Sequence, residues 1–309
     1  MKIQNSILTN EEKIIFTLRA LYDRFGYSLY KMSKFEPYDL YVRNKDFLIS
    51  DHVITFTDVN GKLMALKPDV TLSIIKNSKE EAGKVDKLYY NENVYRVAGA
   101  GRNYREIMQV GLECIGDIDE NCVAEVVTLA VQSLRAISAD FVLDLSHPGI
   151  VTAVTNGLPD AVKSTVLKCV GERNRHELAL ICQQNGVDPM VAELLDGLIG
   201  CYGAPDAVLG QLQKMTLPAA AMMAVQELET LVGGLTNSEN LRIDLSSVSN
   251  TKYYNGITFK GFINGVPESV LSGGRYDKLL ARMGRTSGAI GFAVYLDALE
   301  RFVIEEVGE

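Results

Sequence analysis

Polar side chains that follow a pair of glycines near the end of the sequence are the first candidates for chemistry. In SVLSGGRYD (269–277), Gly273 and Gly274 precede an arginine, Tyr276 and an aspartate. A glycine pair after a strand marks a point where another backbone or a ligand comes close. The alternative is a packed strand-to-helix corner with the aspartate as a helix cap. Phosphate binding is not indicated, because GAGRNY at Gly99 stops two glycines into the dinucleotide-binding pattern.

A second stretch, QVGLE, places an amide and an acid four positions apart. Gln109 and Glu113 project from the same face of a strand, because side chains alternate along it. A solvated sheet face is the ordinary explanation of such a pair. However, Val110 and Leu112 on the opposite face are apolar, and if both faces are covered, the amide and the acid become buried groups that need a partner. An amino-acid ligand with a cationic ring would serve.

Two further stretches have weaker signals. Asp69 and Thr71 stand at the expected start of a helix, where capping is the alternative to ligand binding. Tyr253 and Tyr254 are expected to open a strand, where aromatic residues usually pack against neighbours. Taken one at a time, none of the four stretches identifies a site.

The elements that must position these residues can be predicted from hydrophobic periodicity. Residues 9–25 have an apolar stripe at helical period, with a capping box at the start and a glycine after the end. Residues 52–66 predict a hairpin around an Asn-Gly pair in a type I′ turn, and Pro68 suits the first turn of a short helix. Residues 87–97 and 104–116 predict a longer antiparallel pair.

The middle of the chain changes in character. A helix is expected over 121–137, and from about residue 147 to residue 234 the pattern is almost wholly helical, before strand character returns. Strands first, helices in the middle and strands again predict one α+β core interrupted by a helical domain. We expect the core to comprise 1–146 and 241–309, and the helical insertion to comprise 147–240.

Composition excludes several classes of function. Only three histidines and five cysteines occur among the 309 residues, without C-x-x-C spacing, which argues against a metal centre, a zinc site or a disulfide framework. No long apolar run or signal peptide is present, so we expect a cytoplasmic protein without a membrane partner. The net charge of -8 disfavours nucleic-acid binding, although a local basic patch can survive on an acidic protein.

The order of the motifs along the chain is more informative than any one of them. The series ALKPDVT, NVYR, REIMQVGLE, YYNGITFKGF, SGGRYD and AIGFAVYLDALERF resembles the catalytic core of histidine–tRNA ligases, which are class II aminoacyl-tRNA synthetases, over nearly the whole chain. The resemblance implies an antiparallel sheet flanked by helices and a dimer formed through the N-terminal segment FGYSLYKMSKFEP. It also implies that SGGRYD lines a pocket for free histidine.

The resemblance implies ten histidine-binding residues: Asp69, Thr71, Arg96, Gln109, Glu113, Tyr253, Tyr254, Gly273, Gly274 and Tyr276. Asp69 stands where the ligases have a glutamate that takes the ammonium group, and Arg96 matches the arginine that meets the carboxylate. Gln109 and Glu113 match the residues that grip the amino group and the imidazole. An acid for each cationic end and an arginine for the anionic end make physical sense.

Departures from the ligase pattern fall on the groups that handle ATP. Ala98, Ser249 and Ala298 stand where the ligases have an acidic residue, a catalytic arginine and a nucleotide-binding arginine. Each such group is typically worth roughly a hundredfold to a thousandfold in rate, so their loss predicts that adenylation is abolished. The sequence also ends ten residues after Leu299, where the ligases continue into an anticodon-binding domain, which implies no tRNA partner.

A kept ligand pocket and lost ATP residues resemble the regulatory subunits of ATP phosphoribosyltransferase, which are relatives of the histidine–tRNA ligases. The resemblance implies a non-catalytic, cofactor-free homodimer within a hetero-oligomer. It binds the short-form catalytic subunit of the first step of histidine biosynthesis, activates it, and mediates feedback inhibition by free histidine. Two alternatives stay open: a truncated class II ligase that activates an amino acid for a non-tRNA acceptor, and a stand-alone histidine sensor for another partner.

Overall fold

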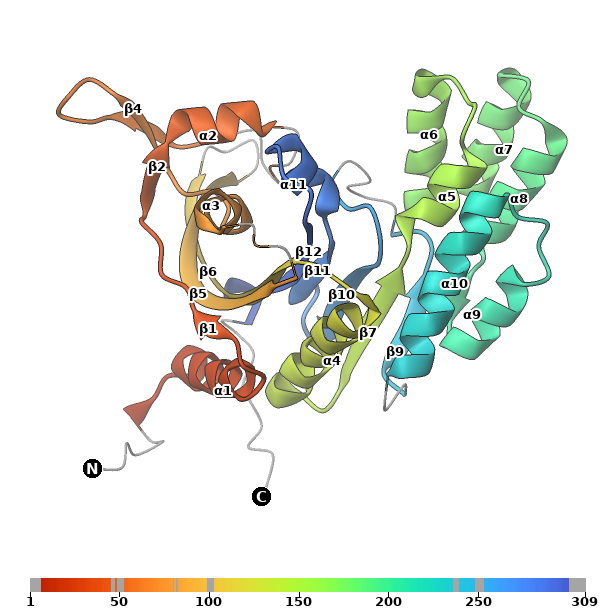
Figure 1. Ribbon diagram of the computed structural model, residues 1–309. Helices are drawn as coiled ribbons and strands as arrows, with labels where there is room; N and C mark the ends of the chain where they lie inside the picture. Colours follow the sequence, from red (N-terminus) through yellow and green to blue (C-terminus); the bar gives the residue numbers. More distant parts are fainter. Residues whose placement is uncertain are drawn as a thin grey trace. The chain divides into compact units, whose positions relative to one another are not determined.

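The computed structural model describes residues 7–45, 48, 53–79, 81, 83–98, 103–235, 239–247 and 253–299. The chain divides into two compact units, whose helices and strands are labelled in Figure 1. Unit 1 comprises Met1–Phe141, Gly261–Gly273 and Asp277–Glu309, and unit 2 comprises Val142–Lys260 and Gly274–Tyr276.

The sheet of unit 1 has mixed strand directions. Its strands, in spatial order, are β1 (Ser28–Leu29), β5 (Val85–Ala98), β6 (Asn103–Gly116), β12 (Gly288–Tyr295), β11 (Leu271–Arg275) and β10 (Thr258–Ile263). Residues 258–260 of β10 and 274–275 of β11 belong to unit 2. β5 and β12 both pair antiparallel with β6, whereas β1 pairs parallel with β5. The predicted α+β class is confirmed, and the largely antiparallel sheet has one short parallel edge.

One face of this sheet is covered by α1 (Asn10–Arg24) and α4 (Glu120–Ile137), which also pack against each other (Figure 1). The Tyr22 ring of α1 contacts the rings of Tyr89 and Phe292, which project from β5 and β12. Aromatic rings in such tilted and edge-on contacts contribute beyond their buried area. This face is therefore an apolar core.

The predicted signals at the ends of α1 are confirmed. The Thr9 hydroxyl accepts the Glu12 N–H at 3.2 Å, and the Glu12 carboxylate accepts the Thr9 N–H at 2.9 Å, which completes the capping box. After the helix, Gly26 has a φ of 81°, a conformation that glycine adopts without steric cost. The helix thus begins and ends where the sequence predicts.

The opposite face of the sheet carries α3 (Thr71–Asn77), whose first residue contacts Glu113 of β6. Two short helices complete the described α-helices of unit 1, α2 (Tyr38–Arg43) and α11 (Asp277–Arg282). Both faces of β6 are therefore covered. This was the condition under which the sequence predicts that Gln109 and Glu113 become buried polar groups, and both are buried.

A second, small sheet of unit 1 contains the predicted hairpin. Its strands are β2 (Phe35–Pro37), β4 (Leu63–Leu66) and β3 (Thr55–Thr57), all antiparallel. The predicted type I′ turn is wrong, because it needs positive φ at Asn60, and Arg173 is the only described non-glycine residue with a positive φ. Instead, the Asp58 carboxylate accepts the N–H groups of Asn60 and Lys62, each at 2.8 Å, and Gly61 takes the left-handed conformation.

Two other local predictions are also wrong. Pro68 does not lie in the first turn of a helix, because α3 begins only at Thr71. Tyr253 and Tyr254 do not open a strand, because they lie in a turn before β10, which begins at Thr258. In both places the chain needs several irregular residues before the regular element starts, and periodicity does not register them.

Unit 2 contains three further strands of the nine-stranded sheet and the helical stretch. Parallel β7 (Phe141–Ser146) and β9 (Leu241–Asp244) pair, and β8 (Tyr202–Gly203) pairs antiparallel with β9. The helices are α5 (Pro148–Val154), α6 (Asp160–Gly171), α7 (Arg175–Gln184), α8 (Pro189–Ile199), α9 (Pro205–Leu212) and α10 (Ala219–Gly234). The insertion boundaries at 147 and 240 stay a prediction. No helix in the described ranges has both the length and the apolar composition to cross a membrane.

Candidate ligand-binding site

The register of three strands in unit 1 places the predicted amide and acid on one surface. Gln109 pairs with Glu92 of β5 on one side and with Tyr295 of β12 on the other. Glu113 lies opposite Gly291 of β12. Residues directly opposite each other in a ladder project from the same face, so these side chains share the face that α3 covers.

Glu113 is held in place by hydrogen bonding and by a close backbone. Its side chain is 2% exposed, and its Oε1 accepts the Thr71 hydroxyl at 2.7 Å. A Cβ at position 291 would collide with the Glu113 carboxylate, so glycine there makes the room that the carboxylate occupies. Gly111 makes room in the same way for the hydroxyl of Tyr90, which sequence reasoning missed.

The Gln109 side chain is 3% exposed. Among the described residues, its amide nitrogen Nε2 is buried and has no hydrogen-bond partner. Buried polar groups are almost always paired, so an unpaired amide donor on the strand face that also carries Glu113 fits the predicted contact with a ligand. This atom is the strongest structural sign of a binding site in unit 1.

Asp69 precedes Val70, the N-cap residue of α3, and its carboxylate accepts a backbone N–H of the first turn, as the alternative interpretation predicts. Its Oδ1 accepts the Leu72 N–H at 2.9 Å. Burial raises the pKa of the Asp69 carboxyl, while the Leu72 N–H and the nearby Arg96 guanidinium act in the opposite direction. Arg96 itself donates from Nε to the Pro68 carbonyl at 3.2 Å. Capping is therefore observed, and a role for Asp69 in binding a ligand stays a prediction.

Two tyrosines on the same face were missed by sequence reasoning. Burial raises the pKa of Tyr90, and the carboxylates of Glu113 and Asp69 add to the effect. Burial likewise raises the pKa of Tyr295, whose hydroxyl shares a hydrogen bond of 2.5 Å with Ser272. Strand alternation places Tyr90 on the same face of β5 as Glu92, but only the register between β5 and β6, which nothing in the sequence gives, places both on the face of Gln109 and Glu113.

In unit 2 the predicted tyrosines form an aromatic cluster. The Tyr253 ring lies 4.7 Å from the Tyr254 ring and 5.6 Å from the Tyr276 ring, measured between centroids. A Cβ at Gly274 would lie 2.8 Å from Cδ1 of Tyr254, so the glycine allows this ring to approach the strand. The structure thus brings together four of the predicted residues within unit 2. Whether they share one pocket with the unit 1 residues stays a prediction.

The glycine pair of SGGRYD does not follow a strand as predicted. Gly273 and Gly274 are the third and fourth residues of β11 (Leu271–Arg275). The next residues are used structurally: the Arg275 side chain lies over Gly256, and the Asp277 carboxylate accepts the Ala289 N–H at 2.9 Å. The close approach that the glycines predict is made, at Gly274, to the protein's own backbone and ring.

The structure describes two of the three positions at which the resemblance implies that ligase groups are replaced. Ala298 lies in a short 3-10 helix, Asp297–Leu299, after β12. Ala98 is the last residue of β5, and Ser249 lies outside the described residues. Within the described ranges, no group of three or more histidine, cysteine or acidic residues could hold a metal ion.

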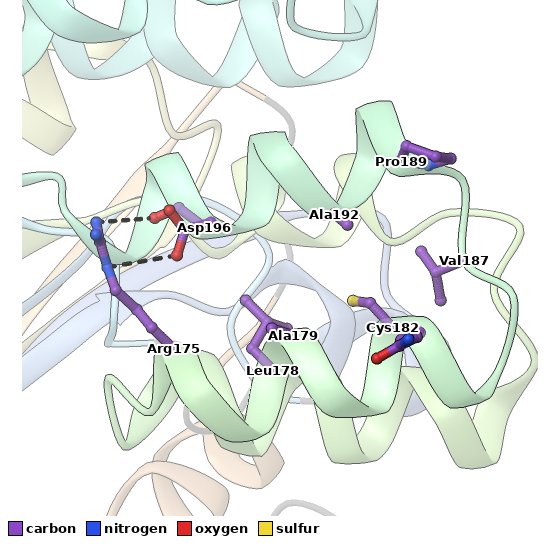
Figure 2. Close-up of a pocket in the computed structure, with 9 residues that line it drawn as sticks. Arg175, Leu178, Ala179, Cys182, Val187, Pro189, Ala192 and Asp196 are labelled. Carbon is purple, nitrogen blue, oxygen red and sulfur yellow. Dashed lines mark hydrogen bonds and ion pairs between the residues drawn. The ribbon is translucent and has the colours of Figure 1, made fainter.

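A cavity of about 290 Å³ lies elsewhere, between α7 and α8 in unit 2 (Figure 2). It is lined by Arg175, Leu178, Ala179, Cys182, Gln183, Val187, Pro189, Ala192 and Asp196. Figure 2 shows Arg175 and Asp196 joined at one end, where the guanidinium donates to the Asp196 carbonyl at 3.1 Å. None of the ten predicted histidine-binding residues lines this cavity, whose walls are mainly apolar.

The fold and the residue set define the class first: a sheet of mixed direction, flanked by helices, as in class II aminoacyl-tRNA synthetases. The family model described as histidyl-tRNA synthetase matches residues 5–299, and the chain belongs to that family.

Within this family, the resemblance to regulatory subunits is confirmed. The ATP phosphoribosyltransferase regulatory subunit of Oceanobacillus iheyensis is 26% identical over 294 residues, which cover 93% of this chain and 72% of that protein. The protein of the same name from Caldanaerobacter subterraneus subsp. tengcongensis is 29% identical over 288 residues, covering 90% and 75%.

Solved structures share the fold. An ATP phosphoribosyltransferase regulatory subunit/histidyl-tRNA synthetase from Bacillus halodurans superposes with a TM-score of 0.82 at 24% identity, covering 97% of this chain and 80% of that one. A chain of the ATP phosphoribosyl transferase (HisG:HisZ) complex from Thermotoga maritima gives 0.75 at 19% identity, covering 94% and 98%. At these identities the similarity establishes the architecture.

Proposed function

We propose that this chain is a non-catalytic regulatory subunit of ATP phosphoribosyltransferase. It binds the short-form catalytic subunit as a homodimer within a hetero-oligomer, activates it, and mediates feedback inhibition by free histidine. The names of its curated relatives support this assignment. The Thermotoga maritima chain, which comes from a complex with the transferase, is matched over nearly its full length.

The observation that carries the proposal is the unpaired, buried Gln109 amide on the same strand face as the buried Glu113 carboxylate. Free histidine has an ammonium group, an imidazole and a carboxylate. Glu113 offers a carboxylate to a cationic group, Gln109 offers amide donors, and Arg96 offers a guanidinium to the ligand carboxylate. Such a set recognises a small zwitterion with a polar ring.

The same proposal assigns no catalysis to the chain. Adenylation needs fixed cations aimed at the phosphoryl group that develops charge. Alanine stands at position 298 and serine at position 249, where the ligases have arginines. The rival function, a truncated ligase that activates an amino acid for a non-tRNA acceptor, predicts histidine-dependent exchange of pyrophosphate into ATP by the purified chain. We expect no exchange above background.

Mixing tests the assignment directly. The phosphoribosyltransferase rate of a short-form catalytic subunit is measured alone and with increasing amounts of this chain, and histidine binding to the chain alone is measured by calorimetry. We expect a saturable rise in rate and a histidine site on the free chain. A rate that does not change at any ratio would refute the partner, whereas binding without stimulation would favour a histidine sensor for another protein.

A further inference from the structure

The Gln109 amide has two neighbouring side chains that could accept hydrogen bonds from its nitrogen. Glu92 and Tyr295 lie directly opposite it in the flanking strands. Directly opposite residues have Cβ atoms about 4.5–5.5 Å apart, so a carboxylate or a phenol at either position could reach an amide between them. Whether the Gln109 donor stays unpaired therefore depends on where the side chains of Glu92 and Tyr295 point.

Both neighbours are engaged with other partners. The Tyr295 hydroxyl is bonded to Ser272 at 2.5 Å. Glu92 Oε2 accepts the Lys67 ammonium at 2.8 Å, and its Oε1 faces the Met32 N–H at 3.5 Å. The carboxylate that lies closest to Gln109 in the ladder is thus turned toward Lys67.

Lys67 is held next to Glu92 by its burial and by its backbone hydrogen bonds. Its side chain is 0% exposed, whereas that of Glu92 is 17% exposed. Its backbone is fixed on both sides, because its N–H donates to the Lys34 carbonyl at 3.1 Å and its carbonyl accepts the Tyr95 N–H at 2.8 Å. A fully buried ammonium is costly without a paired carboxylate, so Lys67 and Glu92 hold each other in one arrangement.

We propose that Lys67 is a positioning residue of the histidine site: it holds the Glu92 carboxylate away from the Gln109 amide and so reserves that amide for the ligand. This inference rests on the proposed histidine-binding function. Without the ammonium, the Glu92 oxygens need a donor, and the orphaned Nε2 across the ladder is a buried donor in need of an acceptor. A hydrogen bond between Glu92 and Gln109 would engage the amide donor that the ligand needs.

A second ion pair in unit 1 offers a matched control. Lys76 donates to Glu36 at 2.6 Å, and Glu36 also accepts the Ser73 hydroxyl at 2.7 Å. Glu36 lies in β2 opposite Ala65, so no orphaned amide stands beside it in its ladder. Loss of Lys76, whose side chain is 37% exposed, removes a Lys–Glu pair from unit 1 without releasing a carboxylate next to Gln109.

The test compares histidine affinities by calorimetry in Lys67→Met, Lys67→Arg, Lys67→Met/Glu92→Leu and Lys76→Met. We expect Lys67→Met to bind histidine about tenfold more weakly or worse, because a charged hydrogen-bond acceptor competes for the amide. Lys67→Arg keeps the cation and should bind as the wild type does. The double variant should recover to within about threefold of the wild type, and Lys76→Met should bind normally.

Two outcomes would overturn the inference: a folded Lys67→Met protein with wild-type affinity, or a double variant that binds as weakly as the single one. If Lys67→Met does not fold, the double variant Lys67→Met/Glu92→Leu still tests the inference. It has no Glu92 carboxylate that could bond to Gln109, so its histidine affinity must match that of the wild type. A crystal structure of Lys67→Met gives a readout without histidine. A Glu92–Gln109 hydrogen bond there supports the positioning role even if the wild type binds no histidine, which would refute only the proposed function.

Discussion

Glu113 is the more deeply buried of the two predicted acids of unit 1, at 2% exposed against 9% for Asp69. Its carboxylate accepts a hydrogen bond from the Thr71 hydroxyl and occupies the space that the missing side chain of Gly291 leaves. A buried carboxylate loses its hydration and needs hydrogen bonds in return, and the Thr71 hydroxyl supplies one of them. The residue is therefore the most direct probe of the proposed histidine site.

We expect Glu113→Gln to weaken histidine binding by about 1.5–3 kcal/mol, because a charge-assisted hydrogen bond to the ligand becomes a neutral one. Calorimetry of the purified chain measures the change. Glu106→Gln is the control, since Glu106 lies in the same strand but is exposed, and its affinity should not change. Equal affinity in Glu113→Gln and the wild type would remove Glu113 from the site.

Ala298 tests the proposed loss of adenylation. An arginine there, as in Ala298→Arg, should not produce histidine-dependent pyrophosphate exchange, because the resemblance implies that Ala98 and Ser249 also replace groups that the ligases use. Each missing donor costs roughly a hundredfold to a thousandfold. Exchange above background in this single variant would contradict the account.

At this scale the sequence could predict which residues are polar and which strand face they share, but not their partners. Gln109 and Glu113 follow from alternation along one strand. The Lys67–Glu92 pair does not, because it joins residues whose proximity is set by how the β4–α3 connection crosses β5, and that crossing is a tertiary feature. The ligand roles of all ten residues came from the family resemblance and stay predictions.

Among the elements, α3 has two possible uses for the carboxylate at its start. Asp69 accepts the Leu72 N–H, and an asparagine can do the same with its side-chain oxygen. Asp69→Asn should therefore leave the free energy of unfolding within about 0.5 kcal/mol of the wild type. If Asp69 also takes the ligand ammonium, histidine affinity should fall about tenfold. Urea denaturation and calorimetry on the same variant separate the two roles, and an unchanged affinity would leave Asp69 as a cap only.

The β7–β9 strand pair of unit 2 contains a carboxyl group with a raised pKa. Asp144 of β7 lies opposite Arg242 of β9. Burial, reinforced by repulsion from Asp244, raises the pKa of Asp144 to about 6, although Arg173, Arg242 and Lys260 act against the rise. A raised acid pKa means that the folded state binds the proton more tightly than the unfolded state. The folded state is therefore penalised above about pH 6, and the penalty disappears as the pH falls toward the ordinary value.

Asp144→Asn should remove this penalty. We expect a gain of about 1 kcal/mol in the free energy of unfolding at pH 8, reduced for partial solvent screening, and a smaller gain at pH 5. Urea denaturation at the two pH values measures it, with the exposed Glu193→Gln as the control that should change little at either pH. A gain of equal size at both pH values would contradict the assignment of the raised pKa.

The elements themselves were largely predictable. The capping box of α1 and the antiparallel β5–β6 pair follow from local signals, and both are confirmed. The turn at Asn60 was wrong because the Asp58 side chain competes for the backbone N–H groups, and a dipeptide rule does not weigh that competition. The start of β10 was placed too early because aromatic residues that pack in a turn resemble those of a strand.

For the whole molecule, the family and the fold are established, whereas the regulatory role is a proposal. Histidine must bind one arrangement of the assembly more tightly than another if occupancy is to control the catalytic subunit. Allosteric coupling of this kind is typically about 1–3 kcal/mol. The effect belongs to the mixed assembly and not to either subunit alone.

The most direct measurement is a histidine titration of the phosphoribosyltransferase rate of a short-form catalytic subunit, taken alone, with the wild-type chain and with Glu113→Gln. The account predicts that both chains raise the rate equally without histidine. It predicts that histidine lowers the rate with the wild-type chain, and that Glu113→Gln needs at least about tenfold more histidine for the same inhibition. Identical histidine curves for the two chains, or inhibition of the catalytic subunit alone at the same concentrations, would contradict it.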